Sequence, residues 1–214
     1  MTTRLKRSQR LKGAIRRLRA KIQATSRTTQ PKEWATIHLL LSDKYNDLER
    51  GQGQARWNLR QAQFHIQKAE RVFTRRQYPE EWATVHALYG HLISRYPWLG
   101  KVRRRLLAIQ HQQLALQVFT RKADPPAMWA ELQNNISDDY GVLFNLRRRP
   151  EDLQRCYRHL RNALAVYRQM RNSHIRRVVG NSHIHRVERR FAATSRILKS
   201  RYFKKLMENR RRSK

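Results

Sequence analysis

The stretch VFTRKADPPAMWAELQNN, at residues 118–135, occurs twice more in similar form: VFTRRQYPEEWATVHALYG at residues 72–90 and TSRTTQPKEWATIHLLLSD at residues 25–43. Each copy contains a tryptophan three positions after a proline, and the spacing between successive tryptophans is almost constant. These tryptophans are Trp34, Trp82 and Trp129. A repeat of this length is typical of proteins built from stacked supersecondary units, which bury their apolar faces against one another.

Each copy predicts a pair of helices. In the first helix, the tryptophan and two later residues fall on one face, and a small residue such as Ser42 lets a neighbouring helix come close. We expect the three tryptophans to be largely buried core residues that seat each hairpin against the next. In the second helix, small residues recur at a fixed spacing, as at Ala62 and Ala69. The prolines suit the first turn of a helix, where the missing N–H is not needed. Strand patterns are absent from the sequence, and helical hairpins are predicted over residues 31–78, 79–125 and 126–170.

Amphipathic segments flank the repeats, and we expect them to cap the array, since the end units need their apolar faces covered. Residues 1–30 are predicted to form a basic N-terminal capping helix, with apolar residues at helical spacing: Leu11, Ile15, Leu18 and Ile22. Residues 171–214 are predicted to form a basic C-terminal helix and tail. Its apolar face comprises Ile184, Val187, Phe191, Thr194 and Leu198. The predicted fold is an all-α, right-handed α-solenoid of about three hairpins with capping helices at both ends.

The L-[SG]-x-x-Y pattern of the first helix and the paired alanines of the second resemble tetratricopeptide repeats. The longer phrase from LQVFTRKADPPAMWAELQNNISDDY to LRNALAVYRQM is similar to a variant of about 45 residues, which is common in cyanobacterial repeat proteins and often accompanies caspase-like CHAT domains. The resemblance covers residues 31–170 and implies an α-solenoid with a binding role, but it does not indicate the ligand. The chain departs from the family in its excess of Lys and Arg, in having three full units, and in lacking an accompanying protease domain.

The functional prediction comes from charge. The chain contains 48 Lys and Arg against 15 Asp and Glu, which gives a net charge of +33. A small domain carries roughly 2–8 net charges, and self-repulsion on the larger scale is relieved when a polyanion binds. The excess is concentrated at the two ends, and residues 1–32 contain no acidic residue. We therefore expect nucleic acid to be the partner.

The predicted phosphate contacts lie in the loops inside the hairpins and on the two capping helices. If the hairpins stack in register, the loops form a basic rim along one edge, and the loop arginines are expected to be solvent-exposed. Contacts of this kind bind phosphates with little sequence preference. The predicted residues are Lys101, Arg103, Arg104, Arg105, Arg147, Arg148 and Arg149 in the loops, Arg186, Arg189 and Arg190 near the C-terminus, and Arg16 and Arg17 near the N-terminus.

Trp57 and Trp98 lie beside these clusters and are candidates for stacking on unpaired bases, with ordinary loop packing as the alternative. The predicted function is non-enzymatic binding of nucleic acid, with RNA favoured, in a ribonucleoprotein complex with other proteins. The alternative is a repeat adaptor that binds an acidic partner protein. We expect a cytoplasmic location, although the Arg-rich, acid-free N-terminus also resembles an organellar targeting segment.

The sequence does not predict catalysis, a cofactor, a metal site or a small-molecule substrate. Cys156 occupies an apolar position at helical spacing, which indicates a buried structural thiol. His174, His183 and His185 cluster without the carboxylates or thiols of a typical metal site. The acids near the arginine clusters are interpreted as balancing charges, and they are Asp138, Asp139, Glu151 and Asp152. The sequence also lacks an apolar run long enough to predict a membrane span.

Overall fold

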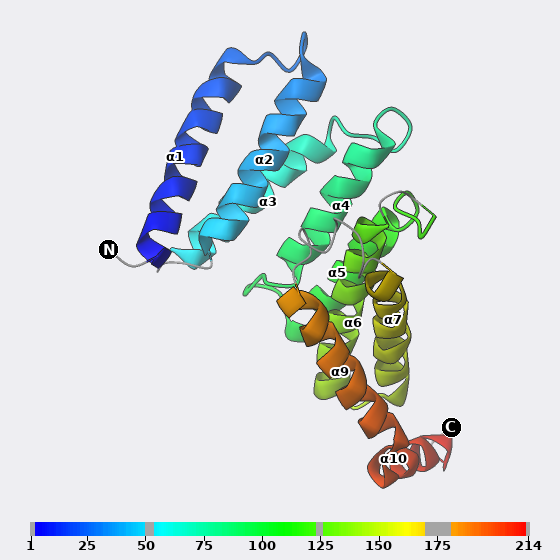
Figure 1. Cartoon of the computed structure of the whole chain (residues 1–214). Coiled ribbons are helices and arrows are strands. Elements are labelled where there is room, and N and C mark those ends of the chain that lie inside the picture. The colour runs from blue at the N-terminus through cyan, green and yellow to red at the C-terminus, as the bar shows by residue number, and fades with distance from the viewer. Residues whose placement is uncertain (1–2, 50–53, 123–125, 170–180, 213–214) are drawn as a thin grey trace. The chain divides into compact units, whose positions relative to one another are not determined.

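The computed structural model describes residues 3–49, 54–122, 126–169 and 181–212. All regular secondary structure in these residues is helical, which confirms the predicted all-α fold (Figure 1). The chain divides into two compact units, Met1–Gly100 (unit 1) and Lys101–Lys214 (unit 2). The division falls inside the segment predicted as the second hairpin, between its two helices, so each unit is described by itself.

In the described part of unit 1, the helices are α1 (Thr3–Ala24), α2 (Pro31–Glu49), α3 (Ala55–Glu70) and α4 (Pro79–Ile93). Each helix packs against the next one along the chain, as Figure 1 shows for α1, α2 and α3. This is the packing of a helical-hairpin solenoid. The expected N-terminal helix is present as α1, which packs against α2, and its predicted apolar residue Ile15 is buried.

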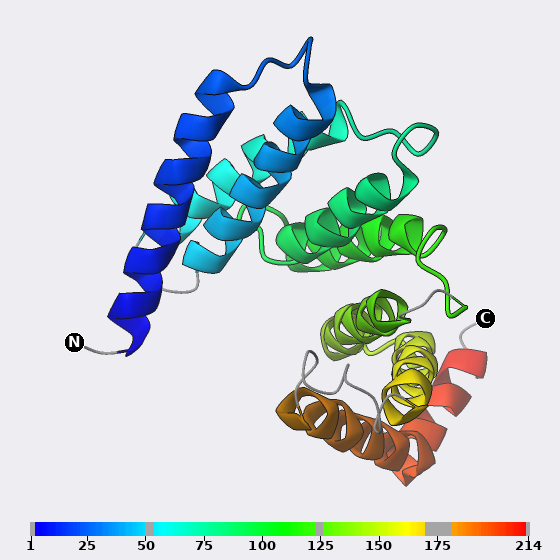
Figure 2. The same ribbon diagram turned by 45° about the horizontal axis from the view of Figure 1, so that its top comes forward.

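In the described part of unit 2, the helices are α5 (Lys101–Ala115), α6 (Ala127–Arg147), α7 (Pro150–Gln169), α9 (Asn181–Lys199) and α10 (Arg201–Arg212). α6 packs against both α5 and α7, and α7 also packs against α9. Figure 2 shows α7 next to α6 on one side and α9 on the other. Consecutive helix pairs therefore form the layers of this unit as well.

The C-terminal segment differs from the prediction of one helix followed by a tail. The helix ends at Lys199, and a second helix, α10, begins after Ser200. The Ser200 hydroxyl accepts a hydrogen bond from the Phe203 backbone N–H at 3.2 Å, as an N-cap serine does. Phe203 is buried against Phe144 and Leu153, so apolar contact holds α10 on the body of unit 2.

The repeated tryptophans are partly buried, which supports their predicted core position only in part. In each copy, the alanine that follows the tryptophan has no exposed surface: Ala35, Ala83 and Ala130. In unit 1, an arginine from the preceding turn covers the indole. The guanidinium carbon of Arg27 lies 5.6 Å from the Trp34 ring centre, and that of Arg75 lies 5.7 Å from the Trp82 ring centre. In these two copies, the phrase therefore places a turn arginine on a half-buried tryptophan.

The small residues at the contact between α2 and α3 allow close approach, as predicted. Ser42 and Ala62 have no exposed surface, and the Ser42 hydroxyl donates a hydrogen bond to the Ala62 carbonyl oxygen at 2.8 Å. At the equivalent positions of the last hairpin, Ser137 in α6 and Cys156 in α7 are both buried. A larger side chain at these positions would force the helices apart.

A polar pair joins the two helices in each of two hairpins, and it is buried in the first and partly buried in the last. In unit 1, the Nδ1 atoms of His38 and His65 are 2.7 Å apart, and the His65 ring stacks on Tyr45 with ring centres 5.6 Å apart. In unit 2, the His159 Nδ1 lies 2.6 Å from the Gln133 Oε1. His159 likewise stacks on the tyrosine of its hairpin, Tyr140, with ring centres 5.7 Å apart. Gln133 of the last hairpin thus occupies the position that His38 occupies in the first hairpin.

Burial keeps these histidines neutral. Desolvation lowers the pKa of His38 to about 4, that of His65 to about 3 and that of His159 to about 4. A neutral imidazole has one donor and one acceptor nitrogen, so one histidine of the first pair donates and the other accepts. The pairs therefore satisfy polar groups that would otherwise be buried without partners.

Among the described residues, the helices are too short or too polar to span a membrane.

Candidate nucleic-acid interface

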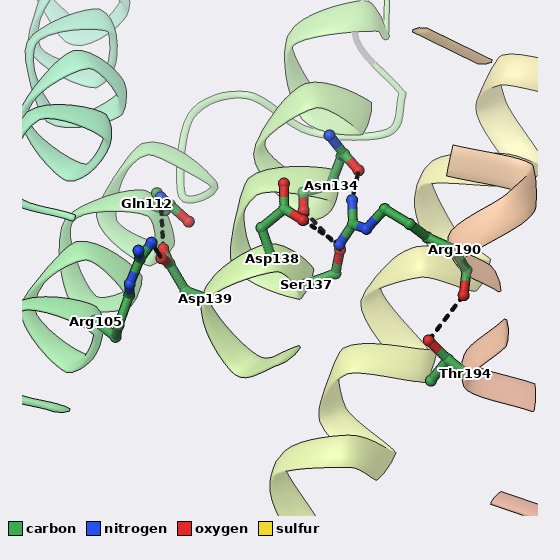
Figure 3. A network of polar contacts seen from close by, with 8 residues as sticks. All are labelled: Arg105, Gln112, Asn134, Ser137, Asp138, Asp139, Arg190 and Thr194. Atoms are coloured by element: carbon green, nitrogen blue, oxygen red, sulfur yellow. Dashed lines mark hydrogen bonds and ion pairs between the residues drawn. The ribbon is translucent and has the colours of Figure 1, made fainter. Parts of the chain in front are cut away.

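Two adjacent carboxylates of α6 bind arginines on opposite sides of the helix (Figure 3). Asp139, which is almost fully buried, accepts hydrogen bonds from Arg105 Nη1 at 2.8 Å and from Gln112 Nε2 at 3.2 Å, both on α5. Asp138 forms an ion pair with Arg190 of α9. Desolvation raises the pKa of the Asp138 carboxyl, and Arg190 opposes that shift. The interpretation of these two acids as balancing charges is confirmed.

Arg190 has further partners that fix it in place. Its Nη1 donates to the Asn134 Oδ1 at 2.9 Å and its Nη2 donates to the Ser137 hydroxyl at 3.1 Å, as Figure 3 shows. The Thr194 hydroxyl, one turn further along α9, donates to the Arg190 carbonyl oxygen at 2.8 Å. Arg190 therefore joins α9 to α6, and its fork is largely occupied.

The acids at the start of α7 balance two more arginines. Arg147, in the last turn of α6, makes a bidentate contact with Asp152: its Nη2 lies 2.7 Å from Oδ1 and its Nε lies 3.1 Å from Oδ2. Glu151 pairs with Arg210 of α10 at 2.7 Å. Carboxylates in the first turn of a helix are also favoured by the helix dipole.

The expectation that these cations lie in exposed loops is wrong for several of them. Lys101, Arg103, Arg104 and Arg105 belong to α5 and Arg147 belongs to α6, and three of these arginines are not exposed. Only 21% of the Arg105 side chain and 17% of the Arg147 side chain are accessible, because each is drawn onto a buried carboxylate. Arg104 is half-buried. Arg190 is also only partly exposed, and the remaining predicted contacts are exposed: Lys101, Arg103, Arg148, Arg149, Arg186 and Arg189 in unit 2, and Arg16 and Arg17 on α1 in unit 1.

Two exposed arginines fill the connection between α6 and α7. Arg148 has a φ of 52°, in the left-handed region that favours glycine, and its N–H donates to the Phe144 carbonyl oxygen at 2.8 Å. Its guanidinium carbon lies 5.7 Å from the Phe144 ring centre. Arg149 follows, and Pro150 begins the next helix. This short connection ends α6 and presents both cations to solvent.

A row of exposed arginines along α7 is missing from the sequence-based prediction. It consists of Arg155, Arg158, Arg161 and Arg168, here called the α7 arginine row. The row spans 13 residues, which corresponds to about 20 Å along a helix axis. It lies opposite the buried face of α7, which contains Leu160 and Ala163. The signal in the sequence was the alternation of arginine with apolar residues in RCYRHLRNALAVYR.

The charges of this row are not compensated. Of the seven acidic residues that the structure describes in unit 2, six lie within ion-pair distance of an arginine or histidine outside the row. Within the described ranges, the row itself has no carboxylate partner, although Arg155 also lies over the Tyr140 ring at 5.5 Å. Arg158 and Arg155 add to desolvation in lowering the pKa of the neighbouring His159. The local potential is therefore positive.

The two predicted stacking residues lie in unit 1. Trp57 on α3 is 47% exposed, and its ring meets the buried Tyr45 edge-on at 5.7 Å. Trp98, in the turn after α4, is half-buried, stacked on Tyr96 at 4.7 Å and covered by the Arg60 guanidinium at 5.8 Å. The Trp98 ring is thus already in contact with two protein side chains. Sequence reasoning missed Phe64, which is 49% exposed on α3.

Cys156 is a buried thiol, as expected. Burial raises its pKa to about 11, so the sulfur is protonated at neutral pH. It lines an open pocket of about 300 Å³ between α6, α7 and α9, whose lining also includes apolar residues and the polar side chains of Asp138, Arg190 and Thr194. Within the part of the chain that the structure describes, clusters of His, Cys, Asp or Glu suited to a metal ion are absent. His174, the third member of the histidine cluster, lies outside the described residues.

Comparison with known proteins found no matching family model, no similar curated protein and no similar solved structure. The resemblance to tetratricopeptide repeats therefore stays a prediction.

Proposed function

We propose that this chain is a non-enzymatic RNA-binding helical-repeat protein that holds the RNA backbone through arginine–phosphate contacts in unit 2. The observation that carries the proposal is the α7 arginine row: four exposed guanidinium groups on one helix face, without carboxylate partners among the described residues. Lys101, Arg103, Arg148 and Arg149 are further exposed cations of this unit. The buried or half-buried arginines position helices and are assigned a structural role.

A merely solvated helix face does not account for this arrangement. Like charges at helical spacings of three or four residues destabilise a helix by roughly 0.2–0.5 kcal/mol per pair, and Arg155, Arg158 and Arg161 are spaced in this way. Acidic residues between them would remove the cost, but the acids of unit 2 are drawn onto other side chains. A polyanion that lies along the row relieves the repulsion and releases its own counterions.

RNA is favoured over DNA because of the chemistry of arginine. Each guanidinium offers a planar fork for phosphate oxygens and a face that stacks on unpaired bases. Unpaired bases are abundant in RNA loops and ends, where most sequence-specific RNA recognition takes place. Phosphate contacts dominate in this proposal, so binding is expected to depend weakly on sequence and strongly on salt.

The test replaces the row by glutamine and compares it with a charge-matched control. The row variant carries Arg155→Gln, Arg158→Gln, Arg161→Gln and Arg168→Gln. The control removes the same charge from exposed arginines that are not among the predicted contacts, with Arg10→Gln, Arg76→Gln, Arg121→Gln and Arg201→Gln. Affinity for a fluorescent RNA is measured by anisotropy over a range of salt concentrations. Each lost phosphate contact lowers the slope of log K against log salt by about 0.7, so the full row changes it by about 3.

The expected result is weaker RNA binding and a flatter salt dependence for the row variant than for the control. Equal losses in both variants would show that binding is spread over the surface and would refute the placement on α7. Unchanged affinity and slope in both would refute RNA binding by these residues. Displacement of RNA by a polyglutamate peptide of equal charge would favour the alternative function, an adaptor for an acidic protein.

A further inference from the structure

Helix α3 of unit 1 carries two exposed aromatic side chains on one face. Trp57 and Phe64 are 47% and 49% exposed, although large aromatic residues are normally placed where they bury most of their surface. They are seven positions apart, which places them on the same side of the helix, about 10 Å from each other along its axis. The two exposed rings therefore lie on one face of α3.

Cations accompany both rings. Arg56 and Arg60 are exposed on the same helix, and the Lys68 ammonium lies 5.3 Å from the Phe64 ring centre. The helix contains a single acidic residue, Glu70, at its last position. Positive charge alternates with aromatic rings along α3, which is the composition of surfaces that bind single-stranded nucleic acid.

Trp57 is held in position before any ligand binds. Its edge-on contact with Tyr45 anchors the indole on a residue that is only 2% exposed, while nearly half of the indole side chain remains open to solvent. Arg60 lies between Trp57 and Phe64 in the sequence, and its guanidinium covers the ring of Trp98. A positioned ring beside fixed cations loses little conformational entropy when a base stacks on it.

We infer that the exposed face of α3 binds single-stranded RNA, with Trp57 and Phe64 stacking on unpaired bases and with Arg56, Arg60 and Lys68 contacting the flanking phosphates. The inference rests on the proposed RNA-binding function. It adds a second binding surface, in unit 1, and a preference for unpaired over paired strands. Bases inside a duplex are already stacked on their neighbours and cannot offer a face to these rings.

The experiment uses the full chain and three ligands of equal length: a single-stranded uridine-rich RNA, its abasic counterpart with the same phosphates, and an RNA duplex. One double variant, Trp57→Leu with Phe64→Leu, removes both aromatic faces. A second, Trp57→Phe with Phe64→Tyr, keeps them. Thermal melting of both variants shows whether unit 1 remains folded, since Trp57 also contacts Tyr45.

We expect the original chain to bind the single strand more tightly than the abasic strand. The leucine double variant should lose about tenfold for each aromatic, equivalent to 1.4 kcal/mol per base, which lies within the range for base stacking. Its affinity for the abasic strand and the duplex should stay unchanged, and the aromatic-preserving variant should bind like the original chain.

Two results would overturn the inference: equal binding of single and abasic strands by the original chain, or a loss in the leucine variant that is the same for all three ligands. Either result leaves the phosphate-based proposal intact, because the abasic strand and the duplex still bind through unit 2. Failure of the original chain to bind any of the three ligands would instead refute the proposed function itself.

Discussion

Replacing His38 by glutamine tests the buried polar pairs that join the two helices of a hairpin. The last hairpin already uses this residue, since Gln133 accepts a hydrogen bond from His159 at 2.6 Å in the place where His38 meets His65 at 2.7 Å. Glutamine at position 38 therefore keeps an acceptor for His65 and removes one titratable group. We expect His38→Gln to leave the free energy of unfolding at pH 8 nearly unchanged, whereas His38→Ala leaves a buried polar group without its partner at a cost of about 1–3 kcal/mol.

The size of the expected effect follows from how the free energy of unfolding changes when the pH is lowered. In the unfolded chain each histidine binds a proton near pH 6.5, but in the folded state His38 and His65 do so only near pH 4 and pH 3. Below pH 6.5 the unfolded state therefore holds more protons, and stability falls as the pH decreases toward 4. Between pH 8 and pH 5 the loss is about 2 kcal/mol for each histidine of the pair. His38→Gln should remove about half of the pair's contribution, and the reverse change, Gln133→His, should add a similar acid sensitivity to unit 2.

Urea unfolding followed by circular dichroism at pH 8 and pH 5 provides the measurement. The free energy of unfolding of the variant is subtracted from that of the original chain at each pH, and this difference is compared between pH 8 and pH 5. The contributions of all other titrating groups cancel in the difference. His185→Gln serves as the control, since 63% of the His185 side chain is accessible on α9. The reasoning would be refuted if His38→Gln and the original chain lost equal stability on acidification, or if the glutamine variant were as unstable at pH 8 as the alanine variant.

Two further predictions concern stability. Arg147→Gln should lower the free energy of unfolding by about 3–5 kcal/mol, because it leaves the Asp152 carboxylate, whose side chain is 2% exposed, without its bidentate partner. Arg149→Gln should change it by no more than about 0.5 kcal/mol, because Arg149 is exposed. Equal effects of the two variants in urea unfolding would contradict the structural role of Arg147. Leu41→Ala should lower the free energy of unfolding by about 2–5 kcal/mol, since Leu41 has no exposed surface, and Trp34→Ala should lower it by less than about 3 kcal/mol, because its indole is only partly buried. If thermal unfolding gives the tryptophan variant the lower melting temperature of the two, the indole is the more important core residue and this reasoning is wrong.

Part of the functional surface followed from the sequence and part did not. The net charge of +33 and the arginine clusters are visible in the sequence, so the hypothesis that the chain binds a polyanion did not depend on the tertiary structure. Which arginines are exposed depended on the tertiary structure, because Arg105 and Asp139 are 34 positions apart in the chain and meet only when α5 packs on α6. Whether a cation is free for phosphate depends on such distant carboxylates, and local spacing carries no information about them.

The sequence by itself determined the helices and the hairpin order. Proline at the first turn, as at Pro31 and Pro79, and apolar residues at helical spacing are local signals that act within one or two turns. Tertiary packing alone decided which surfaces stay open. Phe64 follows the spacing of an ordinary apolar position of an amphipathic helix, yet it is exposed on α3, and the tertiary structure places it on the same side as the predicted stacking candidate Trp57. Exposure is set by which neighbour covers each face, and that neighbour comes from elsewhere in the chain.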